Sequence, residues 1–192
     1  MANKINNILL VGVGGQGILL ASEILSETLM LGGYDVKKAE VHGMAQRGGS
    51  VVSHVRYGEK VYSPIIPEGE ADILFGFELL ESYRYLPLLR GGGRAIVSSL
   101  RINPPGVALG QEEYVAGIPE KITAAFPQSN IIDGMSLARQ AGDMRTVNTV
   151  LLGALSHFID VEESLWRKAL EDRVPERFLE ANIKAFDLGR GA

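Results

Sequence analysis

Short apolar runs alternate with helix-like apolar spacing in the first part of the chain. Residues 8–11 form a continuous apolar run that ends in glycine, which is typical of a buried parallel strand. Residues 18–31 carry apolar side chains at helical spacing and stop at Gly32-Gly33, and residues 35–41 form another strand-like run. Strand, glycine turn, helix and strand together predict a βαβ unit.

The middle of the chain predicts a departure from a purely parallel sheet. Residues 50–57 alternate loosely, and Gly58-Glu59 favours a turn back into residues 60–63, so we expect a β-hairpin there. The pattern then predicts a strand at 72–77 and a helix at 78–89, which Pro87 should disturb near its end. A strand at 94–98 and a Pro- and Gly-rich loop with a short strand at 100–114 follow. A helix at 119–126 and a strand at 130–133 complete this part of the chain.

Helical spacing dominates the C-terminal part of the chain. It predicts helices at 136–142, 146–158 and 162–187, the last of them broken near Pro175. The whole pattern predicts an α/β fold: a mostly parallel, Rossmann-like sheet with an inserted β-hairpin, helices on both faces and C-terminal helices. A length of 192 residues suits a single domain, which we expect to span residues 1–192.

Composition narrows the function. Hydrophobic residues make up 46% and charged residues 22%, as in ordinary globular proteins. The net charge of −4 argues against a general nucleic-acid-binding protein. The chain has no cysteine, so any iron–sulfur cluster must be bound by another chain, and cysteine nucleophiles are excluded. No apolar run reaches membrane-spanning length, so we expect a cytoplasmic protein without membrane contact.

The Gly-Val-Gly-Gly-Gln-Gly motif at residues 12–17 follows the first predicted strand and opens the first helix. Glycines allow close backbone approach, and a helix N-terminus offers free N–H groups to a phosphate or carboxylate. A tight turn without a ligand is the alternative. A dinucleotide site would also need an acidic residue after the second strand, for which Glu40 is the nearest candidate, and a glutamine inside the turn is unusual for such a site.

A second motif follows the second predicted strand, at residues 42–49. In a doubly wound sheet this loop lies at the carboxyl ends of the strands, beside the glycine turn. Arg47 offers a planar fork of donors to phosphate or carboxylate; a structural pairing with an acidic residue is the alternative. The three histidines lack metal-ligand spacing, so we expect no metal site, and we expect hydrogen-bonding or structural roles for His42, His54 and His157.

The two motifs together, followed by residues 53–56 and 148–155, resemble the gamma subunit or gamma domain of 2-oxoacid:ferredoxin oxidoreductases. Within that family the chain is most similar to the small, beta subunit of indolepyruvate ferredoxin oxidoreductase. The resemblance covers about residues 8–155, and we expect it to extend over the whole chain. It implies an enzyme complex that decarboxylates a 2-oxoacid on thiamine diphosphate, passes electrons through iron–sulfur clusters to ferredoxin, and releases an acyl-coenzyme A.

The resemblance also implies what this chain contributes. The gamma domain carries neither thiamine diphosphate nor clusters, which stay on large partner subunits, and it is associated with coenzyme A and with assembly. This sequence lacks the Gly-Asp-Gly…Asn thiamine signature as well as cysteine, so we expect no catalytic residue here and an inactive isolated chain that can dimerise. The expected coenzyme A contacts are Gly12, Gly14, Gly15, Gln16, Gly17, Met44, Gln46, Arg47, Gly48 and Gly49.

Two other functions stay open at this stage. One is a self-contained NAD(P)- or FAD-binding oxidoreductase, which rests on the glycine turn and Glu40. The other is a scaffold subunit without any small-molecule ligand. Asn148, on a predominantly apolar helix, is either a buried polar residue or part of a partner interface.

Overall fold

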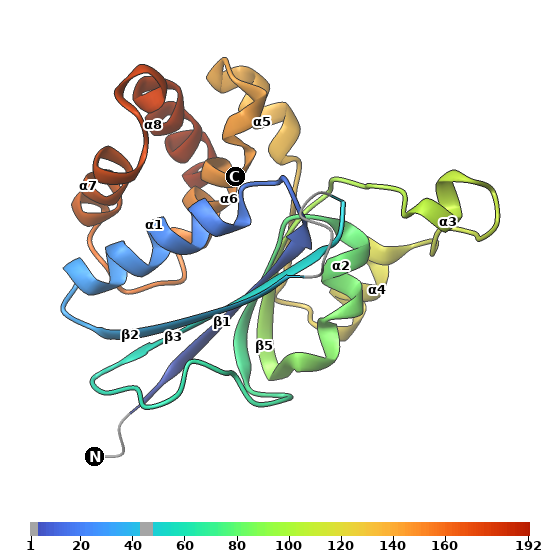
Figure 1. Ribbon diagram of the computed structural model, residues 1–192, viewed down its shortest axis with the longest axis horizontal. Helices are drawn as coiled ribbons and strands as arrows, with labels where there is room; N and C mark the ends of the chain where they lie inside the picture. The colour runs from blue at the N-terminus through green and yellow to red at the C-terminus, as the bar shows by residue number, and fades with distance from the viewer. Residues whose placement is uncertain (1–3, 43–47) are drawn as a thin grey trace.

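The computed structural model describes residues 4–42 and 48–192, and within them a six-stranded sheet forms the centre of the fold (Figure 1). The strand order is β2-β3-β1-β4-β5-β6. Strand β3 runs opposite to the other five, so its pairings with β2 and β1 are antiparallel and the remaining pairings of these strands are parallel. The strands are β1 (Asn6–Val13), β2 (Asp35–His42), β3 (Ser50–Gly58), β4 (Ala71–Gly76), β5 (Leu89–Ser98) and β6 (Asn130–Ile132).

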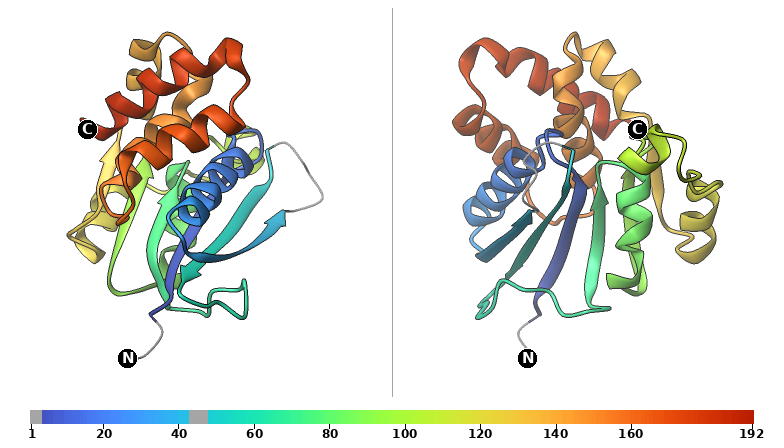
Figure 2. Two further views of the ribbon diagram at one scale, coloured as in Figure 1. Left: turned by 90° about the vertical axis from the view of Figure 1, so that its left-hand side faces the viewer. Right: turned by 45° about the vertical axis from the view of Figure 1, so that its right-hand side comes forward.

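Helices cover both faces of this sheet (Figure 2). On one face lie α1 (Ile18–Leu31), α5 (Gly134–Ala141), η2 (Met144–Thr146), α6 (Val147–Ser156), α7 (Glu163–Arg173) and α8 (Glu176–Arg190). On the other lie α2 (Leu79–Arg84), η1 (Leu86–Leu88) and α4 (Ile118–Ala125), while the short α3 (Pro105–Ala108) projects beyond them (Figure 1). None of the helices in the described part of the chain is long and apolar enough to cross a membrane.

The apolar run of β1 supplies side chains to both layers of the core. Ile8 and Leu10 face α1 and the C-terminal helices, whereas Leu9 and Val11 face α2 and α4. Successive side chains of a strand point to opposite faces, so a strand covered on both sides must be apolar at every position. The continuous run at residues 8–11 follows from this burial.

Helices α6 and α8 cross with their backbones almost in contact. A Cβ atom at Gly153 of α6 would lie 2.1 Å from the carbonyl oxygen of Phe186, and one at Gly189 of α8 would lie 1.9 Å from the carbonyl oxygen of Val150. Only glycine fits at these two positions. The crossing holds α6, which begins with Val147 and Asn148, in a fixed position above the glycine turn.

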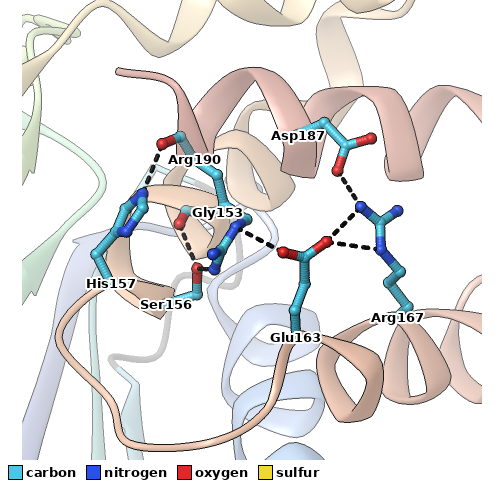
Figure 3. A network of polar contacts seen from close by, with 7 residues as sticks. All are labelled: Gly153, Ser156, His157, Glu163, Arg167, Asp187 and Arg190. Atoms are coloured by element: carbon cyan, nitrogen blue, oxygen red, sulfur yellow. Dashed lines mark hydrogen bonds and ion pairs between the residues drawn. The ribbon is translucent and has the colours of Figure 1, made fainter.

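A polar network joins α6, α7 and α8 (Figure 3). Arg190 donates to the hydroxyl of Ser156 (2.6 Å) and pairs with Glu163 (3.3 Å). Arg167 bridges Glu163 and Asp187, each at 2.6 Å. The C-terminal helix is therefore held by charge pairs at its surface as well as by the glycine crossing beneath them.

The predicted α/β class, with helices on both faces and C-terminal helices, is confirmed, but the inserted hairpin has different strands. β3 pairs with β2 as well as with β1, and residues 60–63 form no strand. Their backbone bonds to side chains instead: the N–H of Val61 donates to Asp35, and Arg56 donates to the carbonyl of Ser63. The short strand predicted within residues 100–114 is also wrong, because Pro105 starts the single-turn helix α3 there.

Candidate functional site

The glycine turn lies at the carboxyl end of β1, where the chain enters α1. Gly15 and Gly17 have φ angles of 101° and 77°, a left-handed conformation that favours glycine. Gly17 is the N-cap of α1, and no side chain of the described residues caps this helix end. The N–H groups of Ile18, Leu19 and Leu20 therefore have no partner within the helix, and they carry the positive end of its dipole.

Two glycines of the second motif bond directly to this turn. The N–H of Gly14 donates to the carbonyl of Gly49 at 2.8 Å, and the N–H of Gly48 donates to the carbonyl of Gly14 at 3.3 Å. The structure thus brings together the described parts of the two predicted motifs. Met44, Gln46 and Arg47 lie outside the described residues, as does the side chain of His42.

Gln16 contacts protein backbone with both ends of its side-chain amide. Its Oε1 accepts from the N–H of Val13 at 2.7 Å, and its Nε2 donates to the carbonyl of Phe77 at 2.8 Å. Asn148 supports the turn from α6, donating to the carbonyl of Gly17 at 3.4 Å while its own side chain is buried. Asn148 is thus a buried residue that packs against the turn.

A pocket of about 570 Å³ opens beside the glycine turn on the α1 face of the sheet. Its lining combines backbone of the turn with apolar side chains: Gly14, Gly15, Gly17, Ile18, Leu19, Leu20 and Val51. Leu19 is 42% exposed although it is a large apolar residue. The pocket therefore adjoins N–H groups that have no partner among the described residues and also has an apolar lining, a combination that suits a ligand with an anionic and an apolar part.

The carboxylate of Glu40 bonds to residues outside the glycine turn. It pairs with Lys38 at 2.8 Å and accepts from the hydroxyl of Ser22 at 3.3 Å. Because β3 lies between β1 and β2, the acidic residue on β2 is not on the strand next to the glycine turn, as a dinucleotide site requires.

The other two histidines have structural contacts. His54 accepts from the N–H of Ile66 through Nδ1 at 3.3 Å, and burial, followed by the charge of Arg56, lowers the pKa of its ring, so the neutral form is favoured. His157 bonds through Nε2 to the carbonyl of Arg190 (Figure 3). Within the described residues, no group of three or more His, Asp or Glu is placed to hold a metal ion.

A buried carboxylate, which the sequence did not lead us to expect, lies on the side of the turn that faces α2. Glu78 follows β4 and accepts from the N–H groups of Glu81 (2.8 Å) and Ile102 (3.0 Å) and from the hydroxyl of Tyr114 (3.2 Å). Burial, followed by the Glu78 charge, raises the pKa of Tyr114 to about 12. The available signal was an acidic residue directly between a predicted strand and helix, the N-cap position. Glu78 thus joins the start of α2 to Ile102 and Tyr114, and it lines one pocket together with Gly48.

Comparison with known proteins identifies the family of this fold. Residues 7–192 match the family model of pyruvate ferredoxin/flavodoxin oxidoreductases. The chain belongs to this family. Among family members it is 38% identical, over 191 residues, to the indolepyruvate oxidoreductase subunit IorB of Thermococcus kodakarensis, covering 95% of this chain and 93% of the relative.

Solved structures agree with this family assignment. The gamma subunit of a keto/oxoacid ferredoxin oxidoreductase from Geobacter sulfurreducens is 27% identical, with a TM-score of 0.68 over 96% of this chain and 95% of that subunit. The 2-oxoglutarate:ferredoxin oxidoreductase of Magnetococcus marinus, solved with 2-oxoglutarate, coenzyme A and succinyl-CoA bound, shares the fold at 22% identity and a TM-score of 0.76. That match covers 98% of this chain and 31% of the longer chain.

Membership of the ferredoxin oxidoreductase family confirms the resemblance seen in the sequence. It supports neither a self-contained NAD(P)- nor an FAD-dependent enzyme. The composition also fits a subunit that carries no iron–sulfur cluster, because the chain has no cysteine to supply a thiolate ligand.

Proposed function

We propose that this chain is the small, non-catalytic subunit of a 2-oxoacid:ferredoxin oxidoreductase and that its glycine turn binds coenzyme A. The complex oxidatively decarboxylates a 2-oxoacid, transfers the acyl group to coenzyme A and passes the electrons to ferredoxin. Thiamine diphosphate and the iron–sulfur clusters belong to a larger partner subunit. Indolepyruvate or another aryl 2-oxoacid is the proposed substrate, because a relative with this name is 38% identical over nearly the full length.

The observation that carries the coenzyme A proposal is the uncapped N-terminus of α1 beside the 570 Å³ pocket. Three N–H groups without a partner among the described residues and the helix dipole favour a phosphate group, and Ile18, Leu19 and Val51 offer apolar surface to the pantetheine arm. Arg47 precedes Gly48 in the sequence, and Gly48 bonds to Gly14. We therefore assign the Arg47 guanidinium to a second phosphate contact.

The test uses the complex of this chain with its thiamine- and cluster-bearing subunit. We expect Arg47→Ala to raise the KM for coenzyme A roughly tenfold or more in a ferredoxin-reduction assay with indolepyruvate, since a charge-assisted hydrogen bond is lost. Arg139→Ala, which removes an exposed arginine in the last turn of α5, is the matched control and should leave the KM unchanged.

Other outcomes would contradict specific parts of the proposal. If both arginine variants assemble normally and bind coenzyme A like the wild type, the Arg47 contact is wrong. A wild-type complex in which only the large subunit binds coenzyme A would make this chain a ligand-free scaffold. Turnover of a 2-oxoacid by the isolated chain would refute the role of non-catalytic subunit.

A further inference from the structure

Gln16 lies at the topological switch point of the sheet, between the neighbouring strands β1 and β4. From β1 the chain passes through α1 towards β2 and β3 on one side, and it later enters β4 on the other side of β1. In open α/β sheets the ligand crevice lies at such a point. Here the Gln16 amide spans it, bonding to the backbone of Val13 at the end of β1 and of Phe77 just after β4.

The first glycine of the motif makes room for this side chain. A Cβ atom at Gly12 would lie 2.7 Å from Oε1 of Gln16 and 2.8 Å from the Cβ of Phe77. Real Cβ atoms do not approach that closely, so Gln16 could not keep its position above any other residue. Gly12 and Gln16 therefore act as one unit that joins the turn to β4.

Gln16 does not fill this crevice, because a pocket of about 510 Å³ lined by Val13, Gly48 and Glu78 stays open on its α2 side. The N–H groups at the start of α1 belong to a different pocket, on the α1 side. The pocket of about 570 Å³ is lined by Gly14, Gly15, Gly17 and the first turn of α1, and Gln16 is not part of that lining. Gly14 is held separately by its bonds to Gly48 and Gly49. The geometry points to Gln16 as a positioning residue, which does not contact the ligand but holds the turn so that an anionic ligand binds on the α1 face.

This inference deepens the proposed coenzyme A site and rests on it for its functional readout. The first variant is Gln16→Met, which keeps the side-chain volume but removes both hydrogen bonds, with Gln140→Met on the exposed face of α5 as control. In the complex without ligand, we expect the Val13 amide to exchange its hydrogen roughly tenfold faster in Gln16→Met, as after the loss of one ordinary hydrogen bond. The Kd for coenzyme A should rise by a similar factor, while the control changes neither quantity.

The second variant, Gln16→Glu, distinguishes positioning from a purely structural role through its pH profile. A protonated carboxyl group can accept from Val13 and donate to the Phe77 carbonyl, whereas a carboxylate places a negative oxygen against that carbonyl. We expect affinity for coenzyme A near the wild-type value at about pH 5 and roughly tenfold weaker at about pH 8. The wild type and Gln140→Glu should show no such additional dependence.

Each remaining outcome has a defined meaning. Unchanged hydrogen exchange at Val13 in Gln16→Met would overturn the positioning role. An equal loss of affinity in Gln16→Met and Gln16→Glu at every pH would also overturn it, because that result indicates direct contact with the ligand. If the wild-type complex binds no coenzyme A, the proposed function fails, yet the exchange measurement still decides whether Gln16 holds the turn.

Discussion

At the scale of single residues, the glycines of the 12–17 motif have different tasks. Gly12 makes room for the Gln16 amide, Gly14 bonds to the second motif, and Gly15 and Gly17 adopt left-handed φ angles. The sequence alone cannot distinguish these roles, because all four residues are glycine. Substitutions separate them, since each task fails for a different physical reason.

Gly12→Ala tests the close packing around Gln16. We expect it to lower the free energy of unfolding by about 1–3 kcal/mol, because the added methyl group overlaps the Gln16 amide and the Phe77 side chain. Gly91→Ala is the control, because a Cβ there meets no atom within 4 Å, and it should change stability by less than about 0.5 kcal/mol. Urea denaturation of both variants measures the difference; equal stabilities would show that the turn is not tightly packed.

The candidate site could be predicted only in part. Glycine spacing between a strand and a helix was enough to locate the turn, and the place of the second motif after β2 was enough to expect contact between the two loops. The role of Gln16 was not accessible, because its bond to Phe77 joins residues 61 positions apart. Glu78 was missed for a similar reason: its partner Tyr114 is 36 positions away.

At the scale of elements, the α6–α8 crossing fixes the helix that supports the turn. Gly153→Ala is expected to lower the free energy of unfolding by about 3 kcal/mol, because the new Cβ would lie 2.1 Å from the backbone carbonyl oxygen of Phe186 and push α6 away from α8. Gly191→Ala, whose Cβ would lie 3.6 Å from its nearest neighbour, should stay within about 0.5 kcal/mol of the wild type. Thermal or urea unfolding compares the two; a tolerated Gly153→Ala would contradict the crossing geometry.

The polar network of Figure 3 makes a smaller, pH-dependent contribution. Hydrogen bonding from Arg167 lowers the pKa of Glu163, so its stabilising effect is present above the ordinary value of 4.5 and is lost as the pH falls through the lowered folded-state pKa. Glu163 is 42% exposed, and we therefore expect Glu163→Gln to cost less than about 1 kcal/mol at pH 7. Urea unfolding at pH 7 and at acid pH measures this; a constant difference at all pH values would contradict the assignment.

The same scale shows why most elements were predictable and one pairing was not. Helix α1 has the predicted bounds because Gly17 and Gly32 flank an apolar stripe. Strand β3 was recognised, but its partner was not, because the pattern of residues 60–63 also favours a strand. What decides the pairing is tertiary: Asp35 and Arg56 bond to the backbone of that segment and hold it as a loop.

At the scale of the whole molecule, the inserted strand β3 separates this sheet from a dinucleotide-binding one. It moves β2 one place further from β1, so that the two strands lie about 10 Å apart instead of about 5 Å. An acidic residue at the end of β2 cannot then contact a ribose held at the β1 turn. The glycine motif is retained, but the second half of the dinucleotide site is absent from this arrangement of the described strands.

This sheet order predicts how the purified chain responds to ligands. Coenzyme A at about one hundred times its Kd should stabilise the folded state by about 2.7 kcal/mol and raise the midpoint of thermal unfolding by about 5–10 °C. NAD or NADP at the same concentration should give no shift, because β3 separates Glu40 of β2 from the strand that carries the turn. A thermal-shift titration with both ligands measures this difference. Stabilisation by NAD and not by coenzyme A would mean that the glycine turn binds NAD without an acidic residue on the neighbouring strand. The position of β3 would then not determine which ligand binds.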